Sequence, residues 1–310
     1  MPRLIPFLVL LTLLLSACGS QPAASTEGGK LKVVATTGQL GDAVRNIAGE
    51  TVELTTLLGP GIDPHTYVAT EGDLRTFQEA DLIFYNGLHL EAQMERVLEQ
   101  IGQSGRTTVV AVGDTLDPLT LLNWEPSAGF PYDPHVWNDV RLWKQVVEVI
   151  RDALIQADPT NSATYSRNTT AYLAELDTLD TYIREQAARI PVERRVIITA
   201  HDAFSYFARA YGFEVEAVQG ISTQTEASTA DIQALAAIVL ERQVPAIFVE
   251  STISPRTIEA VQAAVRAAGQ EVRVGGELYS DALGAPDSPA GTYVGMMRSN
   301  IDTLVAALAG

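Results

Sequence analysis

From Leu31 onward, short apolar runs rich in β-branched residues alternate with longer segments in which apolar residues recur at helical spacing. Strands that alternate with amphipathic helices are typical of βα units around a parallel sheet. The first half of the chain therefore predicts four strands with helices between them. The strands are expected at 31–37, 51–58, 81–87 and 106–113, and the helices near 42–47, 73–80 and 91–101.

The same alternation returns after Pro191. Four further apolar runs, each followed by a loop or an amphipathic segment, predict a second sheet of the same kind. Its strands are expected at 195–200, 213–219, 246–250 and 271–277, and its helices from 202 and over 228–242, 255–268 and 292–308. The two halves share no close repeat of residues, so the predicted duplication is one of architecture only.

Two helical segments lie between the halves, the first over 136–156. The second opens at Asp158-Pro159, since proline is tolerated in the first turn, and it has no internal glycine or proline up to Arg189. About 30 residues at ~1.5 Å each make a rod of roughly 45 Å. We therefore predict an α/β protein with two (β/α)4 lobes of mostly parallel sheets joined by one long connecting α-helix. The N-terminal lobe is expected at 31–158, the linking helix at 159–190 and the C-terminal lobe at 191–310.

The N-terminus carries an export signal. Arg3 precedes an apolar run from Leu4 to Leu15, which is long enough for a signal peptide but too short to span a bilayer. Leu15-Ser16-Ala17-Cys18 follows, and Cys18 is the only cysteine in the chain. This segment resembles a bacterial lipobox, so we predict a lipoprotein signal peptide at 1–17, with lipid on Cys18. The small polar residues that follow predict a flexible tether over 18–30.

Composition narrows the class of partner. The chain has 310 residues, 46% of them hydrophobic, and 38 acidic against 21 basic side chains give a net charge of −17. Nucleic-acid binders need clustered lysine and arginine, so we expect no nucleic-acid partner. No later stretch is apolar and long enough to cross a membrane. We expect a monomer whose body lies outside the cytoplasm, anchored to the cell membrane by Cys18.

Three of the four histidines lie where parallel sheets bind ligands. His65 and His135 each end an Asp-Pro-His tripeptide, and His201 follows the predicted strand 195–200. Neutral imidazole is a common ligand for transition metals, and loops at the carboxyl ends of strands form the binding crevice of open α/β sheets. Each histidine alone could be structural, but together they predict a metal site.

A fourth ligand should be a carboxylate, because no second cysteine supplies a thiolate. Asp281 follows the last predicted strand, although a turn or helix cap explains an aspartate there equally well. Glu250 ends the apolar run AIFVE and is the rival; it could instead hold a ligand histidine from behind. His89 precedes a helix away from these loops, and we expect it not to bind the metal.

Long motifs over nearly all of the mature chain resemble one family. In order, these are GIDPHTY, ADLIFYNGLHLE, DPHVWNDV, ITAHDAFSYFARAYG, IFVESTISPRT, GGELYSDALG and GTYVGMMRSNIDTLVAAL. They are similar to the zinc/manganese solute-binding lipoproteins of bacterial ABC transporters, also called cluster A-I or cluster 9. The resemblance implies metal held between two lobes, with its ligands matched to His65, His135, His201 and Asp281, and an ABC permease and ATPase as partners.

The identity of the metal follows less directly. Three imidazoles and one carboxylate suit zinc by ligand type, and zinc also exceeds manganese in intrinsic affinity. Some members of the family, mostly of the manganese type, carry glutamate at the third ligand position, where this chain has His201. Many zinc-specific members carry a long histidine-rich loop before the second ligand, whereas segment 113–134 is short and has no histidine. We expect zinc in preference to manganese.

Two other functions are compatible with a lipidated zinc protein. A zinc hydrolase is the alternative from another class, but four protein ligands leave no open position for water, and the chain has no His-Glu-x-x-His motif. We therefore expect no enzymatic activity. A surface adhesin, a role of cell adhesion ascribed to such lipoproteins, has no visible motif here. Because Gly275, Gly276 and Gly284 surround Asp281, we expect its loop to move when metal is released.

Overall fold

The computed structural model describes residues 29–124 and 131–310. The predicted signal peptide, the lipid site at Cys18 and almost all of the predicted tether lie outside the described residues. Among the described residues, no helix combines the length and the apolar character that a membrane span requires.

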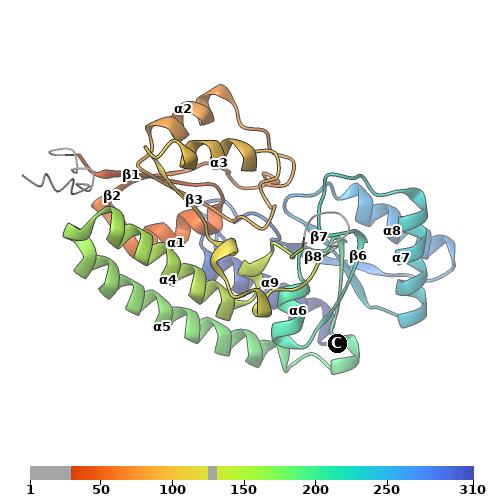
Figure 1. Cartoon of the computed structure of the whole chain (residues 1–310). Coiled ribbons are helices and arrows are strands. Elements are labelled where there is room, and N and C mark those ends of the chain that lie inside the picture. The colour runs from red at the N-terminus through yellow and green to blue at the C-terminus, as the bar shows by residue number, and fades with distance from the viewer. Residues whose placement is uncertain (1–28, 125–130) are drawn as a thin grey trace, which may run out of the picture.

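The first half forms one parallel sheet in the order β2-β1-β3-β4. Side chains on the strands alternate between its faces, as the period of two requires. Val34 and Ile83 face α2 and α3, while Val33 and Ala35 join a cluster on the opposite face, which α1 covers (Figure 1). The elements are β1 (Leu31–Ala35), α1 (Gly38–Ala48), β2 (Val52–Thr56), α2 (Glu71–Glu79), β3 (Leu82–Tyr85), α3 (Glu95–Gln103) and β4 (Thr108–Ala111).

The second half repeats this order. β5 pairs with β6 and β7 pairs with β8, both in parallel, as two two-stranded ladders. β5 lies beside β7, so the strands follow the spatial order β6-β5-β7-β8. The register shifts once, between Ile247 and Val249. The elements are β5 (Val196–His201), α6 (Ser205–Tyr211), β6 (Glu214–Gln219), α7 (Thr229–Arg242), β7 (Ala246–Glu250), α8 (Arg256–Ala267) and β8 (Arg273–Leu278). The predicted α/β architecture with parallel sheets is confirmed, and the strands of the two halves lie in the same spatial order.

Three long helices pack against one another: α4 (Val140–Ala157), α5 (Ser162–Ala187) and α9 (Tyr293–Leu308) (Figure 1). The segment predicted as one helix over 159–189 begins with a 3-10 turn at Pro159–Asn161, so α5 has 26 residues and a length of ~39 Å. It packs along α1, α4 and α9. The C-terminal helix α9 also contacts α1, so α5 is not the only element that spans both halves.

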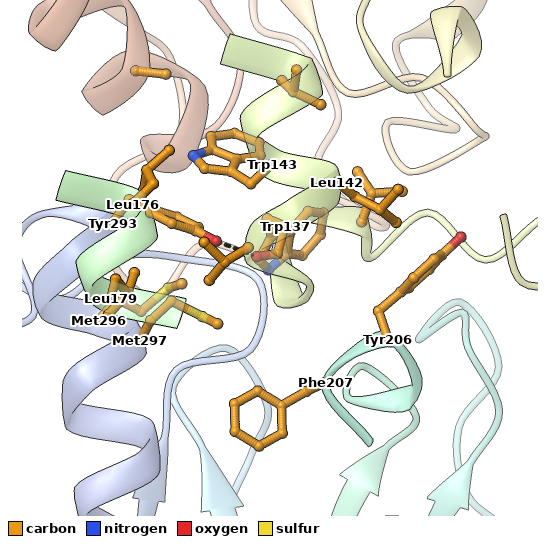
Figure 2. Packing of buried hydrophobic residues seen from close by; sticks show 14 of the residues in the cluster. Trp137, Leu142, Trp143, Leu176, Leu179, Tyr206, Phe207, Tyr293, Met296 and Met297 are labelled. Atoms are coloured by element: carbon orange, nitrogen blue, oxygen red, sulfur yellow. Dashed lines mark hydrogen bonds between the residues drawn. The ribbon is translucent and has the colours of Figure 1, made fainter. Parts of the chain in front are cut away.

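The largest hydrophobic cluster belongs to both halves of the chain and lies along these helices. Trp143 of α4 stacks on Tyr293 of α9, with ring centroids 5.0 Å apart, and the Tyr293 hydroxyl donates to the carbonyl of Trp137 at 2.7 Å (Figure 2). Asp42 of α1 accepts a further hydrogen bond from the Tyr293 amide at 3.1 Å. These contacts join the two sheets on the side of the molecule where α5 and α9 lie.

Candidate metal centre

Four side chains from separate segments meet between the two sheets. His65 lies in the loop after β2, His135 in the loop after β4, His201 at the end of β5 and Asp281 in the loop after β8. Their ligand atoms all lie within 4.8 Å of one another, and each side chain is at most 2% exposed. These are the four residues predicted as ligands, and the structure brings them together. His201 is the last residue of its strand rather than the first residue after it.

The spacing of the four ligand atoms fits a single small cation. His65 Nε2 and His135 Nε2 are 3.3 Å apart, His135 Nε2 and Asp281 Oδ1 are 3.4 Å apart, and His201 Nε2 and Asp281 Oδ2 are 3.2 Å apart. Four ligands at about 2.0–2.1 Å from a tetrahedral zinc ion would lie ~3.3 Å from each other. His65 Nε2 and Asp281 Oδ2 are farther apart, at 4.0 Å, and no two of the ligand atoms are more than 4.8 Å apart.

Each Asp-Pro-His tripeptide folds so that its aspartate accepts the backbone N–H of its histidine. This bond is 2.8 Å long at Asp63 and His65 and 2.9 Å long at Asp133 and His135. The aspartate forms this turn, because its short side chain accepts a hydrogen bond from the backbone two residues ahead. At His135 the same carboxylate oxygen also lies 2.7 Å from Nδ1, which fixes the proton on that nitrogen and leaves Nε2 as a lone-pair donor.

Glu250 lies behind His201 rather than among the ligand atoms. Its Oε1 accepts the backbone N–H groups of Ala200 at 2.8 Å and His201 at 2.9 Å, and its Oε2 lies 2.5 Å from His201 Nδ1. A carboxylate in this position orients an imidazole and makes it a better donor. Of the two roles considered for Glu250, the geometry supports that of a residue holding a ligand histidine.

The pKa values of the cluster differ between its members. Burial lowers the pKa of His65 to about 3, so its imidazole is neutral. Burial also opposes charge on His201, but the carboxylates of Glu250 and Asp281 outweigh it and raise its pKa well above the usual value. Burial acts to raise the pKa of Asp281, yet the facing histidines hold it below its usual range. Without metal, the site therefore holds a proton between His201 and two carboxylates.

Sequence reasoning missed several residues that position the ligands. Glu91 is buried and accepts from the Thr36 hydroxyl at 2.6 Å and the Asn86 amide N–H at 2.8 Å. The Asn86 side chain donates to the carbonyl of Pro134 at 3.0 Å, directly before His135. Burial raises the pKa of Glu91 to about 7. The only hint in the sequence was the glutamate in the motif NGLHLE, whose contacts with segments far along the chain no local pattern reveals.

Two further side chains tie ligand loops to the opposite half of the chain. The Tyr206 hydroxyl of α6 donates to the carbonyl of Asp133 at 2.8 Å and accepts the Leu122 amide at 3.0 Å. The indole of Trp137 donates to the carbonyl of Ser280, next to Asp281, at 2.9 Å. His89 lies outside the cluster, with Nδ1 2.7 Å from Glu95 Oε2.

Comparisons with known proteins agree with this geometry. The family model ZnuA, described as zinc-uptake complex component A, periplasmic, matches residues 33–307. The chain is 49% identical to the zinc-binding protein TroA of Treponema pallidum, over 94% of this chain and 93% of that protein. It is 40% identical to the manganese-binding lipoprotein MntA of Bacillus subtilis, over 96% of each chain. The solved structure of periplasmic zinc-binding TroA from Treponema pallidum matches with a TM-score of 0.88 at 49% identity, covering 91% of this chain and 100% of that one.

Proposed function

We propose the function of this chain from its family membership. The chain belongs to the family of ZnuA, the periplasmic zinc-uptake complex component A. The chain is an extracytoplasmic metal-binding protein of an ABC importer: it captures one divalent transition-metal ion between its lobes and delivers it to the permease. The observation that carries this proposal is the buried set of three imidazoles and one carboxylate whose ligand atoms all lie within 4.8 Å of one another.

We propose His65, His135, His201 and Asp281 as the ligands and zinc as the preferred ion. Carboxylates fix the Nδ1 protons of His135 and His201, so their Nε2 atoms point lone pairs at one place. Imidazole donors favour zinc over manganese. The names of the two relatives do not decide the matter, because TroA is named for zinc and MntA for manganese.

Metal analysis tests this proposal directly. The chain purified without chelator should contain about one equivalent of zinc, and zinc should displace manganese when both compete for the emptied site. Protein that contains no transition metal and binds neither ion would contradict the proposed function. Protein that retains manganese in the presence of equal zinc would contradict only the choice of ion.

The route of delivery is proposed on the same basis. Relatives such as MntA are named lipoproteins, and Cys18 follows an apolar run in the position where such proteins carry lipid. Cys18→Ala should therefore move the protein from the membrane fraction to the soluble fraction and leave its metal affinity unchanged. Wild-type protein that is soluble, with an unmodified residue at its mature N-terminus, would contradict the anchor. The partners are an ABC permease and its ATPase.

The geometry gives no support to the hydrolase. Catalytic zinc usually has three protein ligands and an open position for water, whereas four protein donors fill a tetrahedral shell here. The carboxylates beside the proposed ligands, Asp133 and Glu250, contact the Nδ1 atoms of His135 and His201, on the opposite side of each ring from Nε2. We expect the zinc-loaded chain to hydrolyse a labile ester no faster than free zinc does.

A further inference from the structure

The loop that carries His65 is exposed over much of its length. It runs from residue 57 to residue 70, and in its first part Gly59, Gly61 and Ile62 are all exposed, although His65 itself is buried. Gly61 adopts a left-handed φ of 74°, and a Cβ added there would meet only the carbonyl of Ser251, at 3.6 Å. This loop therefore lies at the surface, with its single ligand turned inward.

Asp63 attaches this loop to the opposite half of the molecule. One carboxylate oxygen accepts the backbone N–H of His65, and the other accepts two hydroxyls. The Thr66 hydroxyl comes from the same loop at 3.0 Å, and the Thr223 hydroxyl comes from the loop between β6 and α7 at 2.7 Å. A longer contact of 3.5 Å joins the Gln224 side chain to the carbonyl of His65.

The loop that carries His65 and the loop that carries Thr223 each lead into a capped helix. Thr70 and Asp73 form a capping box at the start of α2, and Ser228 and Asp231 form the same box at the start of α7. Capping boxes satisfy the free N–H groups of a helix end and hold the chain at its entry. Movement in either loop therefore stops at its helix, and the bond between Asp63 and Thr223 lies between these two points.

The loop that carries Asp281 is held more firmly than its glycines led us to expect. Ser280 to Gly284 are all buried. Asn300 bonds both backbone groups of Tyr279, Trp137 bonds the carbonyl of Ser280, and Gly284 bonds the carbonyl of Ala290. Buried, hydrogen-bonded backbone opens at a higher free-energy cost than an exposed loop. The structure thus favours the loop of His65, not that of Asp281, as the part that moves on release.

We propose that Thr223 is a positioning residue that acts through Asp63 to hold His65 in the closed site, and so sets the rate at which the metal leaves. This inference depends on the proposed metal-binding function. When the Thr223 hydroxyl is absent, Asp63 keeps its bond to the His65 amide, so the loop can swing out as a unit and take His65 with it. The ion is then held by three ligands and exposed to water.

The test compares two hydroxyls that bond the same carboxylate oxygen. Thr223→Val removes the bond between the lobes, Thr66→Val removes the bond within the loop, and Thr223→Ser should restore the wild-type rate. A hydrogen bond to a carboxylate contributes about 1.5 kcal/mol, which corresponds to roughly a tenfold change in rate. In the zinc-loaded full chain, stopped-flow release into excess chelator should therefore be about tenfold faster in Thr223→Val and less than about twofold faster in Thr66→Val.

The outcomes separate the inference from the function on which it depends. Unfolding of the metal-free chains by urea should show both valine variants folded and equally stable, since each loses one hydroxyl bond to the same carboxylate oxygen. Equal release from Thr223→Val and wild type, or equal acceleration in both valine variants, would overturn the role of Thr223 while leaving metal binding intact. Failure of the wild-type chain to retain zinc at all would instead overturn the proposed function.

Discussion

The same tripeptide, Asp-Pro-His, occurs twice at this site and is held in two different ways. In both copies the aspartate accepts the backbone N–H of the histidine. The copy at 133–135 is wholly buried, and Tyr206, Asn86 and the imidazole of His135 itself all bond to it. The copy at 63–65 lies in an exposed loop and is joined to the opposite half through the Asp63 carboxylate.

This difference shows that local sequence sets the turn but its surroundings set how firmly the turn is held. Side chains from β3's loop and from α6 fix the second tripeptide, and they approach it from segments far along the chain. The first tripeptide depends on bonds to two threonines. His135 is therefore held in a rigid frame, whereas His65 has fewer bonds to its surroundings, and we infer that His65 is the freer of the two to move.

Removal of the two imidazoles should give the largest effects. A zinc site of about 10–16 kcal/mol shared among four ligands assigns roughly 3 kcal/mol or more to each, or at least about a hundredfold in affinity. His135→Ala should lose about a thousandfold, and His65→Ala about tenfold less, because water can enter beside the exposed loop. Competition with a chelator measures both. His89→Ala is the control, and a loss as large as that in His65→Ala would contradict the ligand assignment.

The next largest loss of zinc affinity should follow removal of the aspartates, and the two aspartates should differ. Asp133→Ala removes the partner of the His135 imidazole as well as that of its amide, and loss of such a partner costs about 10- to 100-fold in metal affinity. Asp63→Ala removes backbone and hydroxyl contacts, the bond from Thr223 among them, but no contact with an imidazole, and should cost about tenfold, at the low end of that range. Equal losses of zinc affinity in the two variants would show that the tripeptides are held alike.

His65 and His201 should differ in protonation in the metal-free protein, and calorimetry can measure the proton that zinc displaces. The pKa of His201 is raised, so the metal-free protein keeps a proton on this imidazole at pH values above about 6.5, the ordinary pKa of histidine. His65, with its pKa lowered to about 3, is neutral in the same range. Metal must displace the proton, so affinity should rise with pH through the neutral range.

Zinc binding at about pH 7.5 should thus release about one proton, measured in two buffers of different ionisation enthalpy. Glu250→Gln removes a carboxylate that raises the pKa of His201, so the variant should release less than the wild type. Unchanged release in this variant would place the proton elsewhere.

Loss of one tyrosine hydroxyl beside each tripeptide should have the smallest effect. Tyr206→Phe breaks the bonds to Asp133 and Leu122 and should lower the free energy of unfolding by about 1–3 kcal/mol and zinc affinity by a few-fold. Tyr67→Phe loses the bond to Asp73 on the exposed loop and should cost less. Urea unfolding of the metal-free variants checks the order, and the reverse order would contradict a rigid second tripeptide.

The sequence predicted most of the scaffold because its elements depend on local pattern. Strand positions held to within a few residues, since alternating burial and flanking turns define them. The helix predicted over 91–101 begins later, at Glu95, because Gly87, Leu88 and His89 all adopt left-handed φ angles and the chain turns before the helix starts. No periodic pattern reports such a turn.

The site was predicted less evenly. The three histidines could be placed from strand ends alone, but spacing did not separate Asp281 from Glu250, and only the family resemblance chose between them. The geometry shows the physical difference: Glu250 bonds the backbone of β5, and Asp281 faces the imidazoles. Roles such as those of Glu91 and Tyr206 arise from contacts between distant segments, which a single sequence does not report.

The hydrophobic cluster that runs along α4, α5 and α9 also bears on how a newly made chain reaches its final form. It draws on residues from Val33 to Leu308, so the N-terminal half cannot bury its inner face until the last helix has been synthesised. A chain that ends before Tyr293 should therefore leave this inner face exposed.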